Sequence, residues 1–556
     1  MPYKEYDQNT PLLLPPSLDE LIPENDMVRV INRFVEYLPK SSVENKYKNK
    51  TGCPSFHPRM MLKVILYAYS QNIYSCRKIA KAIRQNVNFM WLSAMQRPDF
   101  NTINRFRSDY LKECISIAYV NLMGLLLDKE YIKYEDYFID GTKLEADVSR
   151  TSYVWRKNVK RNRERIQLRA KEIFEDIERL NQEEDKRYGS LDLPETGEAG
   201  KIKSTDIKKA AESLEKAVET VSGDEKKTLG KTIKNLKKDA EKLERYEEQE
   251  EILNNRNSYS KTDHDATFMR MKGSEEVRGG YNVQVGTEKG FVTGYSIGQN
   301  ANDASLFIEH MEKRKEMGLP QAKNIIGDSV YGTEENYSYL EKEKITSYLK
   351  YPNWYREQKC KLRTYEKMSF KYDKENDTFI CPEGRQLIFS ETEERRTKSG
   401  YASSVRRYKG EDCYDCAEKD ECTKSSESRS IEHSEKLARY MEEARSNLMT
   451  EKGIELRKRR GPEVETVFGE LKHNKQYRRL RLRGLKKGFI DLTWLFLSYN
   501  IKRMAKMIEN KWTRTSDIKE KLSLKACSFI EKVNKLMEKF MFYRNLRFLS
   551  VFCENN

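Results

Sequence analysis

The chain has 556 residues, of which 37% are hydrophobic and 35% charged, and its formal net charge is +16. This length suffices for three or four domains, and the positive surplus favours a polyanionic partner such as nucleic acid, although a solvated basic surface would carry the same charge. The polar opening MPYKEYDQNT and the absence of a long apolar run argue against an export signal or a membrane span, so the ten cysteines are expected to be reduced.

The first 130 residues are predicted to be helical, because apolar residues recur every three or four positions in segments such as SLDELIPENDMVRVINRFVEYL. A polar joint, SQNIYS, separates two apolar helical segments, and four basic residues follow it at one-face spacing: Arg77, Lys78, Lys81 and Arg84. The pattern fits a helix-turn-helix-like unit in which Arg77 and Lys81 contact DNA, and equally a plain helical bundle with a basic edge.

A short strand of aromatic and β-branched residues, Tyr137 to Ile139, is predicted to end at Asp140 in YFIDGT. Residues 156–255 then hold mainly Lys, Arg, Glu and regularly spaced apolar residues. This composition predicts a helical hairpin or coiled-coil insertion with a solvated, mixed-charge face.

GGYNVQVGTEKGFVTGYSIGQN predicts a β-hairpin with its turn at residues 288–290. After a helix, NIIGDSVYG predicts an apolar strand that ends at Asp328. Further on, Glu465 lies on a predicted helix with Pro462 in its first turn, among ten or more basic residues.

The alternation of strands and helices predicts an α/β fold with a mixed sheet and large insertions. We expect an N-terminal helical DNA-binding domain over 1–130, three parts of the core over 131–155, 256–351 and 434–510, a helical insertion over 156–255, a cysteine-rich insertion over 352–433 and a basic helical tail over 511–556.

Asp140, Asp328 and Glu465 are candidate metal ligands because hard divalent cations such as Mg²⁺ prefer carboxylate oxygens. Two such ions can activate the attacking oxygen and stabilise the leaving oxygen of a phosphodiester, while nearby basic side chains bind the nucleic-acid backbone. Spacing along the chain leaves open whether the three converge, and a strand that simply ends in a turn explains Asp328 equally well.

Four segments together resemble the signature blocks of bacterial insertion-sequence DDE transposases: YFIDGTKLEADVSRTSYVWRK, TDHDATFMRMKG with GGYNVQV, GDSVYGTEEN and VETVFGELKHNKQYRRLRLRG. The chain is most similar to the insertion-sequence type numbered eleven-eighty-two, which is related to the insertion-sequence-four-like group. The segment from HPRMMLKVILYAY to PDFNTINRFR resembles the helical domain that opens these enzymes, and the similarity covers most of residues 15–505 in order.

The resemblance implies an RNase H-like core in which Asp140, Asp328 and Glu465 hold two Mg²⁺ or Mn²⁺ ions. It also implies a bacterial, cytoplasmic, nucleoid-associated transposase whose partners are double-stranded DNA, both the inverted repeats of its element and the target. Such an enzyme cuts phosphodiester bonds and joins the freed 3′-OH ends to the target. Because two element ends must be held together, the resemblance further implies a homodimer in the DNA complex.

Related enzymes carry a spaced Y-x2-R-x3-E-x6-K signature, which this chain keeps only in part. Glu465 and Lys472 have the required spacing. The arginine position is Gly461, so Arg460 is one residue off, and the tyrosine position is Lys458. Arg460 and Lys472 are still expected to contact DNA.

Four cysteines cluster in the predicted cysteine-rich insertion at C-x31-C-x2-C-x5-C spacing: Cys381, Cys413, Cys416 and Cys422. They could form a structural Zn²⁺ site that stabilises a segment with little apolar core, or remain free thiols.

Two further features could contact DNA. In YRRLRLRG the basic residues Arg478, Arg479, Arg481 and Arg483 alternate with apolar ones, which fits phosphate contacts or a solvated amphipathic segment. Trp155 could stack on an unpaired base or pack in a core.

Two other functions fit the same residues. One is a stand-alone metal-dependent nuclease that cuts without joining, and the other is a non-catalytic DNA-binding protein derived from a transposase.

Overall fold

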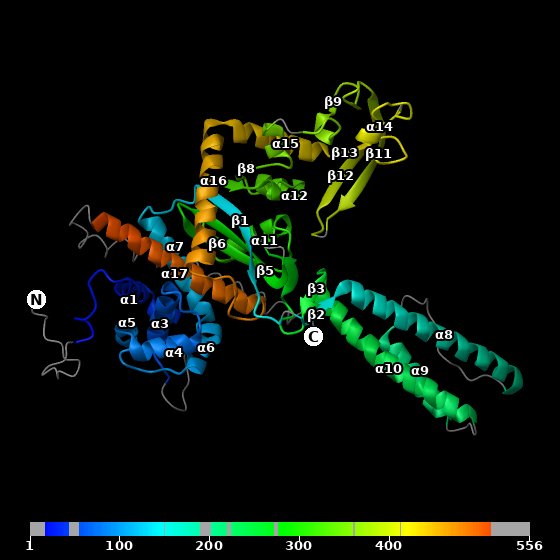
Figure 1. Ribbon diagram of the computed structural model, residues 1–556, viewed down its shortest axis with the longest axis horizontal. Helices are drawn as coiled ribbons and strands as arrows, with labels where there is room; N and C mark the ends of the chain where they lie inside the picture. The colour runs from blue at the N-terminus through cyan, green and yellow to red at the C-terminus, as the bar shows by residue number, and fades with distance from the viewer. Residues whose placement is uncertain are drawn as a thin grey trace, which may run out of the picture.

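The computed structural model describes residues 17–43, 55–149, 151–188, 202–218, 224–271, 276–359, 362–397, 399–411 and 413–512. A central sheet is flanked by helices, with a long helical arm on one side and a smaller sheet at the other end (Figure 1). The basic tail expected over 511–556 lies outside the described residues, apart from its first two. Within the described ranges no single helix is long and apolar enough to cross a membrane, although one bent pair, Phe100–Tyr110 with Lys112–Asp128, meets that requirement.

The central sheet is mixed, as expected for an α/β fold of the RNase H type. Its strands are β1 (Asp136–Glu145), β4 (Thr267–Arg270), β5 (Val277–Glu288), β6 (Phe291–Gly298), β7 (Asn324–Gly327) and β8 (Thr346–Leu349). The order is β4-β5-β1-β7-β8, with β6 also paired to β5. β5 is antiparallel to β1, whereas β7 and β8 run parallel to it.

The predicted β-hairpin is confirmed as β5 and β6, and its turn is set by local backbone geometry. Lys289 and Gly290 link the strands with φ of 49° and 73°. Positive φ at both turn positions matches the right-handed twist of the two strands, and glycine adopts it without strain. The Glu288 carboxylate also accepts hydrogen bonds from the backbone N–H groups of Lys133 and Tyr134, at 3.0 and 2.7 Å, and so holds the start of the core against the turn.

The prediction that the first strand ends at Asp140 is wrong, because β1 continues to Glu145. β5 pairs with β1 from Phe138 to Glu145, and these hydrogen bonds carry the strand past the Asp-Gly step. Asp140 therefore lies in mid-strand. The pairing that decides this comes from a segment about 140 residues later in the chain.

Helices cover both faces of the sheet (Figure 1). One face packs against α16, whose Arg459 lies over the ring of Phe138, and the other packs against α11, where Tyr137 hydrogen-bonds His310 at 2.6 Å. The covering helices are α11 (Phe307–Glu316), α12 (Glu334–Lys342), α15 (Glu435–Met449), α16 (Glu451–Gly469) and α17 (Leu485–Trp512).

The predicted start of the Glu465 helix is also wrong, since α16 begins at Glu451 and Pro462 lies inside it. The side chain of Thr450 caps the helix by accepting a hydrogen bond from the Gly453 N–H at 3.0 Å. A proline lacks the N–H needed in a helix interior, which usually favours a position in the first turn.

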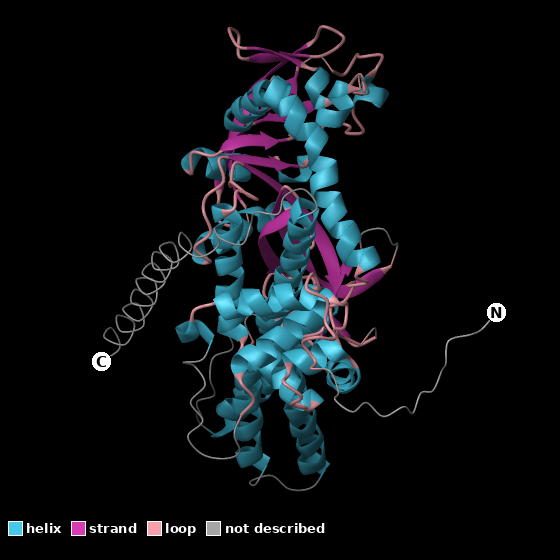
Figure 2. Ribbon diagram, turned by 90° about the vertical axis from the view of Figure 1, so that its left-hand side faces the viewer, coloured by secondary structure: helices cyan, strands magenta, loops and turns pink. Residues whose placement is uncertain are grey.

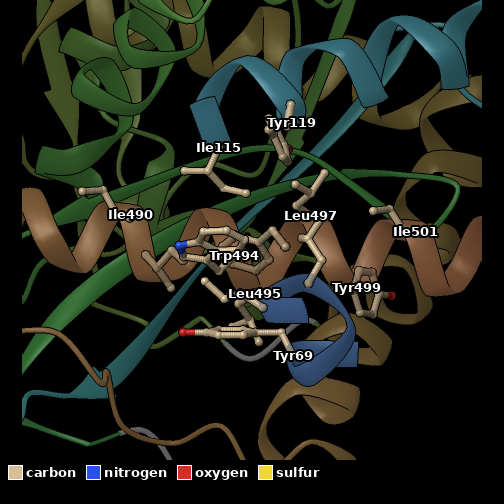
Figure 3. Packing of buried hydrophobic residues seen from close by; sticks show 14 of the residues in the cluster. Tyr69, Ile115, Tyr119, Ile490, Trp494, Leu495, Leu497, Tyr499 and Ile501 are labelled. Carbon is tan, nitrogen blue, oxygen red and sulfur yellow. The ribbon is translucent and has the colours of Figure 1, made fainter. Parts of the chain in front are cut away.

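The N-terminal region is helical in its described part: α1 (Met27–Tyr37), α2 (Lys40–Val43), α3 (Pro58–Ser70), α4 (Cys76–Gln85), α5 (Val87–Leu92), α6 (Phe100–Arg105) and α7 (Lys112–Asp128). Several of these helices pack directly on α17 (Figure 3). Trp494 of α17 is fully buried, lies 6.2 Å from the ring of Tyr69 and donates a hydrogen bond to the Arg107 carbonyl. The same hydrophobic core continues into β5 and β6.

The helical insertion forms an arm of three helices rather than a two-helix hairpin: α8 (Arg156–Tyr188), α9 (Ser204–Val218) and α10 (Asp224–Leu253). It leaves and re-enters the core through the short strands β2 (Tyr153–Trp155) and β3 (Ser258–Ser260), which pair antiparallel. In Figure 2 the arm extends away from the strands of the core. Its apolar core includes Ile207, Leu236 and Leu243, so mixed surface charge surrounds a small packed interior.

The cysteine-rich insertion folds as a separate five-stranded antiparallel sheet. Its strands are β9 (Lys371–Asp373), β10 (Thr378–Ile380), β11 (Gln386–Arg396), β12 (Ala402–Gly410) and β13 (Ser430–His433). Only five buried apolar residues form its core: Phe370, Phe379, Leu387, Tyr408 and Ile431.

Candidate active site

Asp140 and Asp328 lie side by side at the centre of the sheet. β1 and β7 are parallel, and Phe138 is paired with Ile326. Continuing that register by two residues places Asp140 opposite Asp328, and neighbouring strands are about 4.8 Å apart. Because β7 ends at Gly327, the edge of β1 beside Asp140 is no longer paired. The two predicted aspartates are therefore brought together, although 188 residues separate them in the chain.

Arg460 of α16 bridges the two aspartates. Its Nη2 lies 3.5 Å from Asp140 Oδ2 and 3.7 Å from Asp328 Oδ2. The Arg460 and Asp140 side chains are only 13% and 14% exposed, and that of Asp328 is 35% exposed. One guanidinium thus neutralises two neighbouring carboxylates in a largely desolvated position, where their mutual repulsion would otherwise be strong.

The oxygen atoms of this pair suit a hard divalent cation. Asp140 Oδ1 accepts a hydrogen bond from the Gly141 N–H at 2.8 Å. Asp328 Oδ1 is buried, yet it has no hydrogen-bond partner among the residues that the structure describes. A buried carboxylate oxygen without a partner is costly, and coordination of a cation would satisfy it.

Glu465 does not join the aspartates in this arrangement. Its side chain is exposed and lies along the helix beside Gly461. Among the described residues, no group of three His, Cys, Asp or Glu side chains is arranged as a metal site. The structure brings together Asp140 and Asp328 of the three predicted carboxylates, and the role of Glu465 stays a prediction.

The side of α16 that carries Glu465 nonetheless faces toward the carboxyl end of β1. Phe468 and Lys472, from the same side of the helix, line a small cavity together with Thr142 and Leu144. Glu465 therefore extends from the flank of α16 that borders the continuation of β1 past Asp140.

The opposite flank of α16 is tied to the amino end of β1. Arg459 pairs with Asp136 at 3.1 Å, and the Gly290 N–H donates to Glu463 at 2.7 Å. These contacts fix the rotation of the helix about its axis and place its two flanks on different sides of the aspartate pair.

A further acidic residue, Asp303, lies close to the site, and the sequence carried no signal for it. Its Oδ1 accepts hydrogen bonds from Asn282 at 2.5 Å and Gln284 at 3.2 Å. A Cβ at Gly141 would come within 2.5 Å of the same oxygen, so the glycine after Asp140 permits this close approach.

Tyr331 extends this network beneath the aspartates. Its hydroxyl donates to Gln284 Oε1 at 2.5 Å. Burial, followed by the charges of Asp140, Asp303 and Asp328, raises the pKa of Tyr331 well above its usual value. The tyrosine is therefore a neutral hydrogen-bond donor on the floor of the site.

Two segments of the chain match known sequence families. Residues 380–505 match the family described as "Transposase DDE domain", and residues 16–109 match "Transposase domain (DUF772)". Over these two segments the chain is similar to transposases of the DDE type. A comparison with curated proteins found no match.

The predicted site residues of the chain fall partly inside and partly outside the two matched segments. The first contains Arg460, Glu465 and Lys472, and the second contains the basic helix α4. Asp140 and Asp328 lie between the matched segments. Their assignment depends on the strand register and on Arg460, which joins them to the matched DDE domain.

The basic row formed by Arg478, Arg479, Arg481 and Arg483 runs beside the end of β1. Glu145 N–H donates to the Arg478 carbonyl and Leu480 N–H to the Glu145 carbonyl, both at 2.9 Å. Arg479 donates to the carbonyls of Ala146 and Val148, and Arg483 pairs with Asp147 at 3.0 Å.

Two arginines of this row have structural partners, while two are more available. Arg479 and Arg483 hold the 146–148 segment through these bonds, and their contact with DNA stays a prediction. Arg478 and Arg481 are exposed. The start of α17 that follows them is capped by aspartates, because the Leu485 N–H donates to the Asp265 carboxylate at 2.8 Å. Lys472, also predicted to bind DNA, is half-buried near Thr142.

The predicted N-terminal DNA contacts lie on α4, with Arg77, Lys78, Lys81 and Arg84 all exposed. The buried face of this helix carries Ile79 and Ile83. The guanidinium of Arg77 lies 4.9 Å from the centre of the Phe100 ring. The separation of buried and basic faces leaves the cations open to a polyanion.

The four clustered cysteines are free thiols around the small antiparallel sheet, three in loops and Cys422 at the end of the short helix α14 (Lys419–Cys422). Arg385 N–H donates to Cys381 Sγ at 3.2 Å, and the Arg385 side chain donates to the Asp415 carbonyl, between Cys413 and Cys416, at 3.2 Å. Burial raises the pKa of Cys422, and the other three thiols raise it further. The loops thus converge, although no group of three described thiols has the arrangement of a formed metal site.

Proposed function

We propose that this transposase binds the inverted-repeat ends of its insertion sequence, cleaves DNA there and joins the freed 3′-OH ends to target DNA. The observation that carries the proposal is the pair formed by Asp140 and Asp328 at the point where β7 ends. One oxygen of the pair is buried without a hydrogen-bond partner within the described chain. The site is accessible at an open strand edge and lies beside a strongly basic helix.

Asp140 and Asp328 would hold Mg²⁺ or Mn²⁺, with Glu465 completing a set for two ions. When bound, such ions activate the attacking oxygen and neutralise charge at the phosphate. Glu465 reaches the pair from the flank of α16 through a change of its exposed side chain. Tyr331 and Gln284 support the floor of the site through their hydrogen bond.

Arg460 is a positioning residue in this proposal. It holds the two carboxylates facing one another, because its guanidinium lies within 4 Å of an oxygen of each. A guanidinium is also suited to a phosphate, so the same side chain is available to the DNA backbone once the carboxylates have other partners.

The DNA would contact two basic regions of the chain. α4 presents its exposed cations to the inverted repeat, and Arg478, Arg481 and Lys472 contact the backbone beside β1. Phosphate contacts of this kind supply most of the affinity and make it depend on salt. Since two element ends must be joined, we expect a homodimer in the complex.

The test is strand cleavage of a duplex that contains one element end, with Mg²⁺. Asp140→Asn and Asp328→Asn should each remove cleavage while leaving DNA binding intact. Asp136→Asn is the matched control, because Asp136 lies four residues earlier on β1 and pairs with Arg459 instead.

The outcomes separate the proposal from its rivals. Cleavage that survives Asp328→Asn would show that the carboxylate assignment is wrong. Cleavage without joined products would indicate a stand-alone nuclease, and binding without cleavage a non-catalytic DNA-binding protein.

The proposal includes a structural Zn²⁺ held by Cys381, Cys413, Cys416 and Cys422. The Arg385 N–H donates to Cys381 Sγ, and the Arg385 side chain ties this loop to the Cys413–Cys416 loop. A sheet with only five buried apolar residues gains stability from such a cross-link. The thiols would close around the ion from their present converging positions.

A further inference from the structure

A groove of about 420 Å³ lies where the helical arm joins the core. β2, β3, α8 and α10 form its walls. Its size suits a group such as a nucleobase with its sugar. Trp155, which is 39% exposed, lies in its lining and contacts Phe268 at a ring-centre distance of 5.0 Å and 80° between the ring planes.

The lining combines three kinds of side chain that recognise an unpaired nucleotide. Aromatic rings, including Trp155 and Tyr246, offer stacking surfaces. The amides of Asn158, Asn162 and Gln249 each carry donors and an acceptor that match base edges. None of these three amides forms a hydrogen bond within the described chain, so their bonding capacity is available to a ligand.

Two cations of the groove also lack the partners that other cations on the arm have. Lys208 pairs with Glu244 at 2.8 Å and Lys237 with Glu215 at 2.6 Å across the arm. For Arg245 and Lys261, both exposed at the groove, the described residues offer no ion pair. Positive charge without an internal counter-charge favours a phosphate, and distinguishes the groove from the solvated surface of the arm.

The groove is connected to the active site by β1. Gly279 N–H donates to the Tyr153 hydroxyl at 3.1 Å, and the next residue, Gly280, is paired with Glu145 at the end of β1. From Asp140 to Glu145 the strand advances five residues, or roughly 17 Å. The row from Arg478 to Arg483 runs beside the last part of this path.

We propose that this groove binds an unpaired nucleotide of DNA that lies past the end of β1 from the bond that is cut, with the base stacked on Trp155 and the phosphate at Arg245 and Lys261. The inference rests on the proposed function for its biological setting. The binding itself needs no cleavage. An unpaired base fits better than a duplex, because the aromatic rings require an exposed base face.

The test measures binding by the full chain in EDTA, so that catalysis plays no part. The probe is a single-stranded thymidine oligonucleotide of about twelve nucleotides with one central 2-aminopurine, whose fluorescence falls when the base stacks. Its fully paired duplex is the comparison. Trp155→Ala should weaken single-strand binding by roughly 5- to 150-fold, the range for one lost stacked base, and remove the fluorescence decrease. Duplex affinity should stay within about twofold.

Two variants make the result specific. Asn158→Asp keeps the size of an exposed side chain but adds a negative charge, and it should also weaken single-strand binding. Trp91→Ala is the matched control, because Trp91 is a partly exposed tryptophan on α5 beside Arg29 and should leave both affinities unchanged. The proposal is overturned if Trp155→Ala and Asn158→Asp bind the oligonucleotide like wild type, or if Trp155→Ala weakens duplex and single strand alike. Cleavage by Asp328→Asn would instead overturn the proposed carboxylate site and leave the groove standing.

Discussion

Replacing Arg460 by methionine should destabilise the protein in EDTA and increase its stabilisation by Mg²⁺. The guanidinium lies 3.5 and 3.7 Å from the two aspartates, so each attraction is worth about 5 kcal/mol at an effective dielectric constant of 20. Desolvation offsets much of this, and removing one partner of a buried ion pair costs about 3–5 kcal/mol. Because Asp328 is 35% exposed, solvent screens its unpaired charge, and we expect a loss of about 1–3 kcal/mol.

The response to Mg²⁺ has the opposite sign. In the wild type a cation must compete with Arg460 for the carboxylate oxygens. The methionine variant leaves two neighbouring negative charges without a counter-charge, so its affinity for Mg²⁺ should rise. A ligand that binds only the folded state increases the free energy of unfolding, and the increase grows with the ratio of ligand concentration to dissociation constant. Each tenfold gain in affinity contributes at most about 1.4 kcal/mol.

The assay is thermal unfolding of the full chain in EDTA and in excess MgCl₂, with Arg459→Met as the control. Arg459 is adjacent on α16 but pairs with Asp136 at 3.1 Å, so its loss should lower the melting temperature without changing the Mg²⁺ response. Equal Mg²⁺ responses in the two variants would refute the competition between Arg460 and the cation. An Arg460→Met protein as stable as wild type in EDTA would refute the electrostatic role of the bridge.

Three further predictions concern other parts of the fold. Burial lowers the pKa of His310 to about 3, so between that pH and the unfolded value near 6.5 only the unfolded chain takes up the proton. The free energy of unfolding should therefore fall as the pH is lowered through this window, by up to about 1.4 kcal/mol per pH unit. His310→Gln should reduce the difference between the urea midpoints measured at pH 7 and pH 5. Asp491 is fully buried and accepts hydrogen bonds from Tyr69 and Tyr477 at 2.5 and 2.6 Å, so Asp491→Ala should cost at least about 3 kcal/mol in urea unfolding, and a loss below about 1 kcal/mol would contradict this account. Purified protein should contain about one zinc ion per chain by elemental mass spectrometry. The Cys416→Ser variant should lose this zinc, and the control variant Cys76→Ser should keep it. Zinc retained in the Cys416→Ser variant would show that the four clustered cysteines are not the zinc site.

Much of the aspartate pair could be predicted from the sequence. The apolar residues before Asp140 and Asp328 indicate strands, and those strands are present. The termination of β7 before Asp328 is a local property, set by Gly327 and the polar residues after it. β1 continues because β5 pairs with it, and no local pattern around Asp140 carries that information.

The rest of the site depends on contacts between distant segments. Asp303 approaches Asp140 through side chains of β5, and its own neighbourhood in the chain has no motif. Arg460 was one residue away from the signature position, yet it is the residue that bridges the aspartates, because the rotation of α16 is set by packing and not by spacing.

The contacts that position α16 are largely made by residues other than the carboxylates of the candidate active site. Val464 and Val467 are buried against the sheet and core, Arg459 pairs with Asp136, and Glu463 accepts from the Gly290 N–H. These interactions hold the helix whether or not Glu465 binds anything, and Glu465 is itself exposed. A neutral substitution at Glu465 should therefore leave the fold intact. The loss of cleavage in such a variant can be assigned to the missing carboxylate, whereas a variant of Arg460 must first be corrected for its effect on stability.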